Sequence, residues 1–180
     1  MLDLLTFDVT PADELRADEK QELIAFCAKA YDENFDRLFE GLPGSVHVRA
    51  RLAGTLVSHA AWATRWLQPE ELPLLRTASV EAVAKAAPYR NQGFGAAVMQ
   101  RLAASLNEFD LGALSPATQA ITLYQRLGWE LWQGPLSIRT ADGLFTTPQE
   151  NVMILRLART PASLDLRRAL NAEWRPGELW

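Results

Sequence analysis

The sequence predicts an α/β fold built around one mixed sheet, and three observations support it. Segments with strand character come first, strand and helix patterns then alternate, and an amphipathic helix pattern lies near the middle of the chain. A helix that links two strands favours a parallel pair, so part of the sheet beside that helix is expected to be parallel. Because no internal repeat and no linker interrupts the 180 residues, we expect a single domain over residues 1–180.

The first half of the chain is expected to hold several strands and one helix. Thr10 and Pro11 predict the start of that helix, with Thr10 as N-cap and Pro11 as first helical residue, and apolar spacing continues it to about residue 30. Ala53-Gly54 joins two segments rich in valine, alanine and aromatic residues, which predicts a hairpin. The expected strands cover residues 2–9, 45–52, 55–66 and 73–86.

The second half begins with the middle helix. Apolar side chains from Gly93 to about Phe109 recur at three- and four-residue steps, which is typical of a helix that faces a core. A second helix is expected from Pro116 to about Leu127, closed by Gly128 in the C′ position. Further strands are expected at 111–115, in two short pieces around 129–139, and at 151–158, and a tail of 159–180 follows.

Composition and charge limit the classes of function. The chain has 18 basic and 22 acidic residues, a net charge of −4 at pH 7. Nucleic acid is therefore not expected as a partner, since phosphate binding needs a basic face, whereas a cationic ligand is favoured. The N-terminus lacks the basic segment of a signal peptide, and no apolar run reaches the roughly 20 residues that span a bilayer. We expect a soluble, cytoplasmic protein without a membrane partner.

The cysteine and the histidines do not indicate metal or nucleophilic chemistry. Cys27 lies in an apolar helical pattern and is interpreted as a small buried side chain, and a single cysteine points to a reducing compartment. His47 and His59 lack metal-ligand spacing with another histidine or cysteine, and no G-x-S-x-G segment accompanies Ser58. Both histidines are interpreted as ordinary strand residues, and no metal is expected.

The segment Arg90-Asn91-Gln92-Gly93-Phe94-Gly95 connects a strand to the middle helix and is the most informative stretch. Its two glycines allow a tight turn and a close approach of the backbone to a ligand, and the amides at the helix start then point toward a bound anion. The segment is either a phosphate or pyrophosphate cradle or a turn without a ligand. Val98 stands where G-x-G-x-x-G needs glycine, and a P-loop ending is absent.

Glu81 and Tyr124 could carry proton transfer. Glu81 lies inside the apolar strand segment SVEAV, where an acid is solvated, paired or functional. A carboxylate in a cleft can take a proton from an ammonium group, directly or through one water. Tyr124 lies in the second helix, where a phenol can protonate a departing thiolate or serve only in packing.

Two motifs resemble those of the GNAT acyltransferases. The pattern R-x-x-G-x-G at residues 90–95 is similar to the coenzyme A loop of that family, and AITLYQRLGW at 120–129 resembles its A-x-x-L-Y-x-x-x-G-F/W segment. The resemblance implies the GNAT fold, with a mixed, mostly antiparallel central sheet, a splayed parallel pair and flanking helices. It also implies an acetyl-CoA-dependent N-acetyltransferase, with acetyl-CoA as co-substrate and no metal.

The resemblance also assigns coenzyme-binding and catalytic residues. In the family, loop amides bind the pyrophosphate of acetyl-CoA, and the preceding strand offers backbone groups to the pantetheine and the acetyl carbonyl. A glutamate near the position of Glu81 acts as base in many members, and a tyrosine at the position of Tyr124 faces the coenzyme sulfur. The implied coenzyme-binding residues are Val83, Ala84, Lys85, Arg90, Gln92, Gly93, Phe94, Gly95 and Ala96.

Residues 79–180 look like one GNAT subgroup, the aminoglycoside 2′-N-acetyltransferases, through segments such as VEAVA, LYQRLGW and the closing EWRPGELW. In that subgroup the carboxylate of a C-terminal tryptophan and nearby acids help to hold a polycationic sugar, so the tail 159–180 contributes to the expected acceptor site. The family has aspartates where this chain has Glu150 and Glu178. The implied acceptor-site residues are Asp32, Asp36, Ser115, Glu150, Glu178 and Trp180, with Glu33 as an alternative in the N-terminal segment.

The expected reaction is acetyl transfer from acetyl-CoA to a primary amine, with the 2′-amine of an aminoglycoside as the preferred acceptor and antibiotic resistance as the matching role. Two alternatives stay open: a GNAT enzyme for another amine (a polyamine, a cell-wall amino sugar or a peptide N-terminus), and a CoA-binding module without catalysis. In another interpretation of the tail, Trp174 and Trp180 only cover sheet surface, and this is the expected role of Trp174. The expected assembly is a homodimer.

Overall fold

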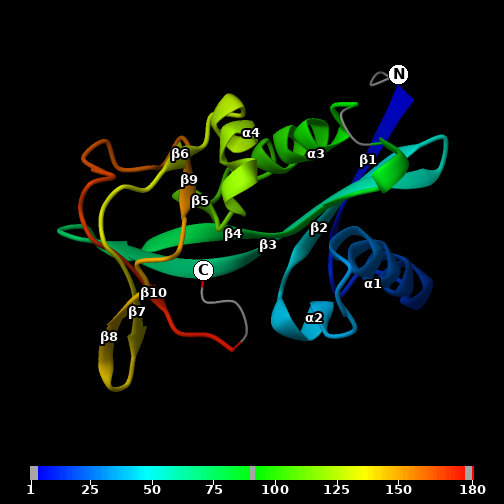
Figure 1. Cartoon of the computed structure of the whole chain (residues 1–180). Coiled ribbons are helices and arrows are strands. Elements are labelled where there is room, and N and C mark those ends of the chain that lie inside the picture. Colours follow the sequence, from blue (N-terminus) through cyan, green and yellow to red (C-terminus); the bar gives the residue numbers. More distant parts are fainter. Residues whose placement is uncertain (1–3, 90–91, 177–179) are drawn as a thin grey trace. The chain divides into compact units, whose positions relative to one another are not determined.

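The structure, a computed structural model, describes residues 4–89, 92–176 and 180 of the chain. It divides into two compact units that alternate along the sequence (Figure 1). The first comprises Met1–Ala63 and Val80–Ser105, and the second comprises Thr64–Ser79 and Leu106–Trp180. The single domain expected over 1–180 stays a prediction.

An antiparallel sheet forms the base of the first unit. Its strands are β1 (Leu5–Pro11), β2 (Val46–Leu52) and the first part of β3 (Thr55–Pro69). The turn between β2 and β3 is the predicted hairpin, since Ala53 and Gly54 have φ values of 48° and 84°, the left-handed pair that a tight two-residue turn needs. The hairpin brings the middle of β2 beside the middle of β3, with Arg49 opposite His59.

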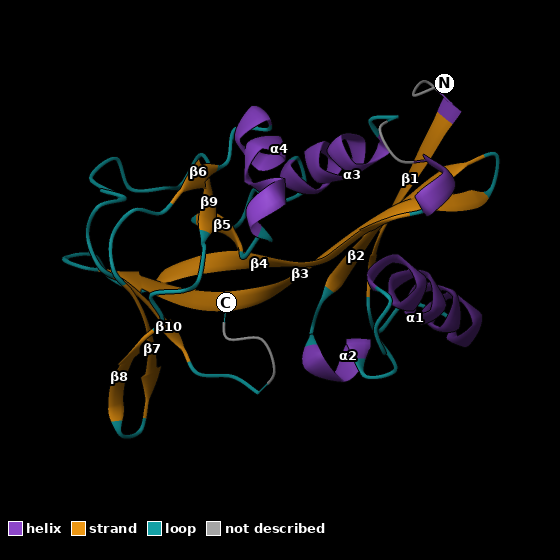
Figure 2. Ribbon diagram, in the orientation of Figure 1, coloured by secondary structure: helices purple, strands orange, loops and turns teal. Residues whose placement is uncertain are grey.

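Helices cover both faces of this sheet. Figure 2 shows α1 (Ala17–Tyr31) and α2 (Leu38–Gly41) on one face and α3 (Phe94–Ala103) on the other. Residues Leu23 and Cys27 of α1 are fully buried. Cys27 is therefore the small buried side chain that the sequence predicted, and burial raises the pKa of its thiol to about 12.

The predicted start of α1 was wrong. Thr10 and Pro11 belong to β1, where they pair with His47 and Val46. The ladder with β2 keeps them extended, and proline is tolerated at the end of an edge strand because it has no N–H to lose. The helix begins six residues later at Ala17, where the carboxylate of Glu19 accepts from the N–H of Arg16 at 3.0 Å.

The second unit is built on a mixed sheet. Besides residues 64–69 of β3 and 75–79 of β4 (Leu75–Lys85), its strands are β5 (Leu111–Leu114), β6 (Glu130–Leu131), β7 (Leu136–Thr140), β8 (Gly143–Thr146), β9 (Met153–Arg156) and β10 (Leu170–Glu173). Their order is β6-β9-β5-β4-β3-β10-β7-β8. Strands β4 and β5 pair in parallel from Thr77 to Ser79, so the predicted parallel pair is confirmed.

Strand β10 lies in the tail and was not predicted. It inserts between β3, to which it is antiparallel, and β7, to which it is parallel. Only Leu170 and Ala172 of its four residues face the core, and two apolar positions are too few to define a period. Long-range pairing, which the local sequence does not encode, makes this segment a strand.

Two helix bounds also differ from the prediction. Helix α3 ends at Ala103 instead of near Phe109, because the chain turns at Leu106, whose carbonyl accepts from the N–H of Phe109 at 3.1 Å. The helix expected from Pro116 consists of a 3₁₀ turn at Thr118–Ala120 followed by α4 (Ile121–Arg126). Gly128 follows with a φ of 87°, as predicted for the C′ position.

Candidate functional site

Strand β4 is irregular at the point where the sequence placed the acetyl-binding backbone. Ala82 has a φ of 50°, a left-handed conformation that is strained for a residue with a side chain. The half-buried Glu81 precedes it and the half-buried Val83 follows it. Such strain persists only where the surroundings hold it in place.

Three side chains hold the backbone here, one on each of three successive carbonyls. His59 Nδ1 lies 2.9 Å from the carbonyl oxygen of Ala82. The Tyr31 hydroxyl donates to the carbonyl of Val83 at 2.9 Å, and the Ser58 hydroxyl donates to that of Ala84 at 3.0 Å. Each of the peptide planes 82–83, 83–84 and 84–85 thus accepts a hydrogen bond from a side chain of the first unit.

The start of α3 has the geometry of an anion cradle. Gly93 is the N-cap residue with a φ of 85°, and among the described residues no side chain caps the helix. The first intrahelical bond runs from the N–H of Ala97 to the carbonyl of Gly93, so the amides of Phe94, Gly95 and Ala96 precede it. Together with the helix dipole these amides favour a bound phosphate.

The side chains of the cradle fit a pyrophosphate. A Cβ built on Gly95 would meet only Cδ of Lys85, at 3.8 Å, so the backbone is open on that side and a lysine stem lies beside it. Lys85 is exposed and can bring its ammonium to an anion. Gln92 instead turns onto its own loop and donates to the carbonyl of Pro88 at 3.3 Å. Arg90 and Asn91 lie outside the described residues.

Phe94 contributes to the cradle through its backbone. Its side chain is 1% exposed and packs against Tyr89 with ring centroids 5.7 Å apart. The predicted coenzyme-binding position is therefore an amide position, and the ring anchors the helix start to the core.

Tyr124 lies on α4 in the second unit. Its side chain is 8% exposed and meets Trp129 edge to face at 6.2 Å between centroids. Burial raises the pKa of its phenol to about 12, so the hydroxyl stays protonated at neutral pH and keeps a proton to give. The packing role and the acid role are both compatible with this position. Its proposed partner Glu81 belongs to the first unit.

The N-terminal acids predicted for the acceptor site surround the end of α1. Asp32 and Glu33 are exposed and follow Tyr31, the residue that bonds to Val83. The structure therefore brings Asp32 to the neighbourhood of the β4 irregularity within the first unit. Asp36 is also exposed, and its carboxylate accepts from the side-chain amide of Asn34 at 3.0 Å.

Two of the acceptor residues predicted in the C-terminal half, Glu150 and Trp180, contact Thr147. The buried indole of Trp180 donates from Nε1 to Thr147 Oγ1 at 2.8 Å. Glu150 closes a turn through its N–H, which donates to the carbonyl of Thr147 at 3.1 Å. No sequence motif indicates Thr147, because its contact with Trp180 spans 33 residues. Glu178 lies outside the described residues.

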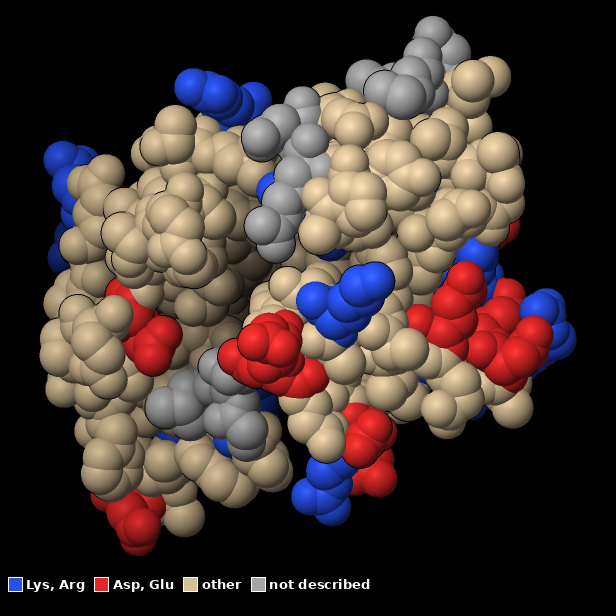
Figure 3. Space-filling view, turned by 45° about the vertical axis from the view of Figure 1, so that its right-hand side comes forward, with Lys and Arg blue, Asp and Glu red and all other residues tan. Residues whose placement is uncertain are grey.

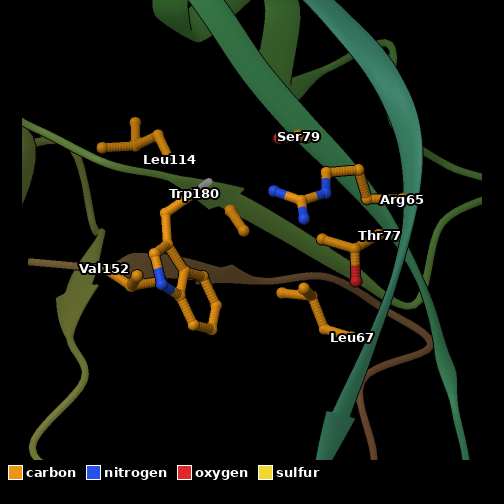
Figure 4. Close-up of a pocket in the computed structure, with 8 residues that line it drawn as sticks. Arg65, Leu67, Thr77, Ser79, Leu114, Val152 and Trp180 are labelled. Atoms are coloured by element: carbon orange, nitrogen blue, oxygen red, sulfur yellow. The ribbon is translucent and has the colours of Figure 1, made fainter. Parts of the chain in front are cut away.

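Trp180 borders a small cavity in the second unit. The cavity has a volume of about 10 Å³, room for roughly one water molecule. In Figure 4 the indole of Trp180 and the guanidinium of Arg65 project into this region from different segments. The indole is also part of the apolar core of this unit, as expected if the ring of Trp180 only packs. The main-chain oxygen of Trp180 accepts a hydrogen bond from Arg175 at 3.3 Å.

Two further tail and loop residues lie at the surface. Ser115 is exposed directly after β5, whose last residue Leu114 lines the cavity. Trp174, which was expected to cover sheet surface, is 55% exposed. It borders an open groove with the 55% exposed Phe145 of β8.

Charged side chains of both signs lie on the surface. In the view of Figure 3, acidic and basic side chains are interspersed, and no extended basic patch lies among the residues described there.

Within the described part of the chain no three His, Cys, Asp or Glu side chains group as metal ligands. No helix in that part is both long and apolar enough to cross a membrane.

A left-handed kink in a strand, followed by an uncapped helix start with open glycine backbone, is the arrangement of an acyltransferase that uses coenzyme A. The sequence matches the family described as Acetyltransferase (GNAT) family over residues 12–129, and the chain belongs to that family. Over 158 residues it is 34% identical to the aminoglycoside 2′-N-acetyltransferase of Mycolicibacterium fortuitum, an alignment that covers 84% of this chain and 80% of that protein.

Solved structures of low identity share the fold. A GNAT family N-acetyltransferase (YhbS) from Escherichia coli, in complex with CoA, is 17% identical with a TM-score of 0.64, and covers 93% of this chain and 90% of its own. An acyl-CoA N-acyltransferase from Pseudomonas aeruginosa is 14% identical with a TM-score of 0.61. The match covers 84% of this chain and 99% of that protein's chain. The predicted GNAT fold is confirmed, and the protein is an acetyl-CoA-dependent N-acetyltransferase.

Proposed function

We propose that the protein transfers an acetyl group from acetyl-CoA to an aminoglycoside, at the 2′-amine. One observation carries this substrate: the relative named for that reaction is 34% identical over 84% of the chain. Exposed acids near the β4 irregularity and the Trp180–Thr147–Glu150 cluster support a cationic acceptor, because carboxylates around a cleft attract ammonium groups.

In this proposal the first unit binds the coenzyme. The amides of Phe94, Gly95 and Ala96 hold the pyrophosphate, with Lys85 and Arg90 as cationic partners and Gly93 as the turn that aims the helix. The backbone of Val83 and Ala84 receives the pantetheine arm. Acetyl-CoA supplies an activated thioester carbonyl for attack by an amine.

In this proposal Glu81 acts as the general base and Tyr124 acts as the general acid. Glu81 takes the proton of the substrate ammonium through one water, and the free amine then attacks the thioester carbon. The N–H of Val83 stabilises the negative charge that develops on the carbonyl oxygen. Tyr124 protonates the departing thiolate as the carbon–sulfur bond breaks, and the second proton lost by the acetylated nitrogen restores the phenol. The proton held by Glu81 passes to solvent, so one proton is released overall.

The acceptor residues in this proposal are those implied by the resemblance to the 2′-N-acetyltransferases. Asp32 and Asp36 are the candidates that follow α1, and Glu150, Glu178 and Ser115 are the candidates in the C-terminal half of the chain. Trp180, whose buried indole donates to Thr147, is a further proposed acceptor residue. In a cell that meets aminoglycosides this reaction gives antibiotic resistance.

A thiol-release assay with acetyl-CoA tests the proposal. Kanamycin B, which has a 2′-amine, is compared with kanamycin A, which has a 2′-hydroxyl at that position. We expect release with kanamycin B and at most background release with kanamycin A. Equal rates with both would contradict the 2′ assignment. A rate above background with only a polyamine or a peptide would identify another GNAT acceptor.

A further inference from the structure

A chain of buried polar side chains runs through the core of the first unit and ends at the β4 irregularity. Ser45 Oγ lies 3.0 Å from His47 Nε2, and His47 Nδ1 lies 3.0 Å from His59 Nε2. His59 Nδ1 lies 2.9 Å from the carbonyl oxygen of Ala82. Ser45, His47 and His59 are all fully buried. These three residues are called the histidine relay.

The contacts fix the direction of every hydrogen bond in the relay. A carbonyl only accepts, so His59 Nδ1 carries the proton that faces Ala82. Burial lowers the pKa of His59 to about 4 and that of His47 to about 3, so both rings are neutral near pH 7. A neutral His59 must then accept at Nε2, which makes His47 Nδ1 a donor and leaves His47 Nε2 to accept from Ser45.

The relay therefore places both histidines in the Nδ1–H tautomer and points every donor toward Ala82. The packing around them does not compete for these protons. Cys27 Sγ lies 3.6 Å from His59 Nδ1 and is a weak acceptor, and Phe39 of α2 packs on the His47 ring with centroids 5.0 Å apart. The His–His contact also leaves no ring nitrogen of the relay available to a metal ion.

The carbonyl of Ala82 and the N–H of Val83 belong to one planar trans peptide and point in opposite directions. A hydrogen bond to the carbonyl fixes the plane from the core side, and hydrogen bonds in series polarise one another. We propose that the histidine relay positions and polarises the Ala82–Val83 peptide so that its N–H faces the acetyl carbonyl, a role that rests on the proposed acetyl transfer. The three relay residues are positioning residues and touch no substrate.

The relay also explains how Ala82 keeps a left-handed φ of 50°. This conformation strains a residue with a side chain, and a buried donor that is satisfied only in this geometry is the kind of contact that maintains it. Loss of the donor lets the peptide plane relax and rotates the N–H of Val83 away from the reacting carbonyl.

Nitrogen NMR of the wild-type protein tests the relay without any variant. The chain has only two histidines, so both rings can be assigned in uniformly ¹⁵N-labelled protein. We expect both in the Nδ1–H tautomer at pH 7, with the Nδ1 proton of His59 protected from exchange. A proton on Nε2 of His59 would overturn the proposed direction of the relay.

Kinetics of two matched variants test the positioning role. His59→Leu removes the donor to Ala82, whereas His59→Asn places an amide N–H close to the position of Nδ1. We expect His59→Leu to lower kcat about tenfold or more while KM for acetyl-CoA stays within about twofold. His59→Asn is expected to recover most of kcat. Cys27→Ala, which disturbs the same core without removing the donor, should keep kcat.

The outcomes separate this role from the acetyl transfer on which it rests. An active wild type with an unchanged kcat in His59→Leu, or with equal losses in His59→Leu and His59→Asn, would overturn the positioning role alone. A wild type that acetylates no amine would overturn the proposed function, and the NMR measurement would still decide whether the relay exists.

Discussion

At the residue scale, Tyr124 is the proposed acid that protonates the leaving thiolate. Burial raises its pKa to about 12 while the ring packs on Trp129. Tyr124→Phe keeps that packing and removes the proton, so we expect kcat to fall about a hundredfold with no change in thermal stability. Steady-state thiol release and thermal unfolding measure the two effects.

Glu81→Gln tests the other end of the proton transfer. The variant keeps the size of the side chain and removes the base, so kcat/KM should fall most at neutral and lower pH, where the amine is charged. If Glu81→Gln and Tyr124→Phe both retain wild-type kcat/KM, the catalytic assignment is wrong.

Gly95→Ala separates coenzyme binding from stability. The added Cβ would meet only Lys85 Cδ, at 3.8 Å, and alanine favours a helix over glycine by up to about 1 kcal/mol. We therefore expect an unchanged or slightly higher unfolding temperature, together with a KM for acetyl-CoA raised about tenfold, because the methyl group occupies the open side of the cradle. An unchanged KM would show that no pyrophosphate binds there.

Candidate site residues could be proposed from the sequence where a local pattern indicates a role, and these roles stay predictions. Gly93 and Gly95 belong to one loop, and Tyr124 belongs to one helical motif. Thr147 and the relay histidines were missed or taken as ordinary, because their roles depend on contacts across 33 and 23 residues. A buried histidine pair is recognised only once β2 and β3 are placed in register.

At the element scale, the backbone at Gly134 lies very close to the backbone at Arg168, just before β10. A Cβ on Gly134 would lie 2.0 Å from the carbonyl oxygen of Arg168, which is main chain and cannot turn aside. Gly134→Ala should therefore reduce the free energy of unfolding by about 3 kcal/mol. Urea unfolding measures the loss. Gly41→Ala, whose Cβ would meet nothing within 4 Å, is the control and should stay near wild type.

Elements with strong local signals were predicted, and those that depend on pairing were not. The β2–β3 hairpin follows from Ala53-Gly54 between two apolar runs, and the parallel β4–β5 pair follows from the helix that connects them. Strand β10 has two inward residues and exists because β3 and β7 pair with it. The start of α1 was misplaced because pairing with β2 outweighs a local N-cap pattern.

At the scale of the whole molecule, the relay makes stability depend on pH. His47 and His59 have folded pKa values of about 3 and about 4, below the ordinary 6.5. Above pH 6.5 both histidines are neutral in the folded and in the unfolded chain. Below it the unfolded chain binds protons that the folded chain does not, so stability falls with pH by up to about 1.4 kcal/mol per unit for each histidine.

Lys20, Arg49, Cys27 and Glu19 are the ionisable groups around the pair. Burial raises the pKa of Cys27 to about 12, so its thiol remains neutral over this range. Glu19 is a carboxylate whose pKa is lowered by its hydrogen bond to Arg49. Urea unfolding between pH 7 and pH 5, above the carboxylate range, isolates the histidines. A constant free energy of unfolding over that interval would show that the pair is not buried and neutral.

The position of the acetyl group in the product tests the proposed function most directly. Kanamycin B offers several amines, and NMR of its product with acetyl-CoA identifies the one that is acetylated. Acetyl transfer to a 2′-amine, supported by the relative that is 34% identical, predicts one product with the amide at the 2′ nitrogen. A product acetylated at another nitrogen would contradict the proposed acceptor geometry, and no product at all would contradict the aminoglycoside as substrate.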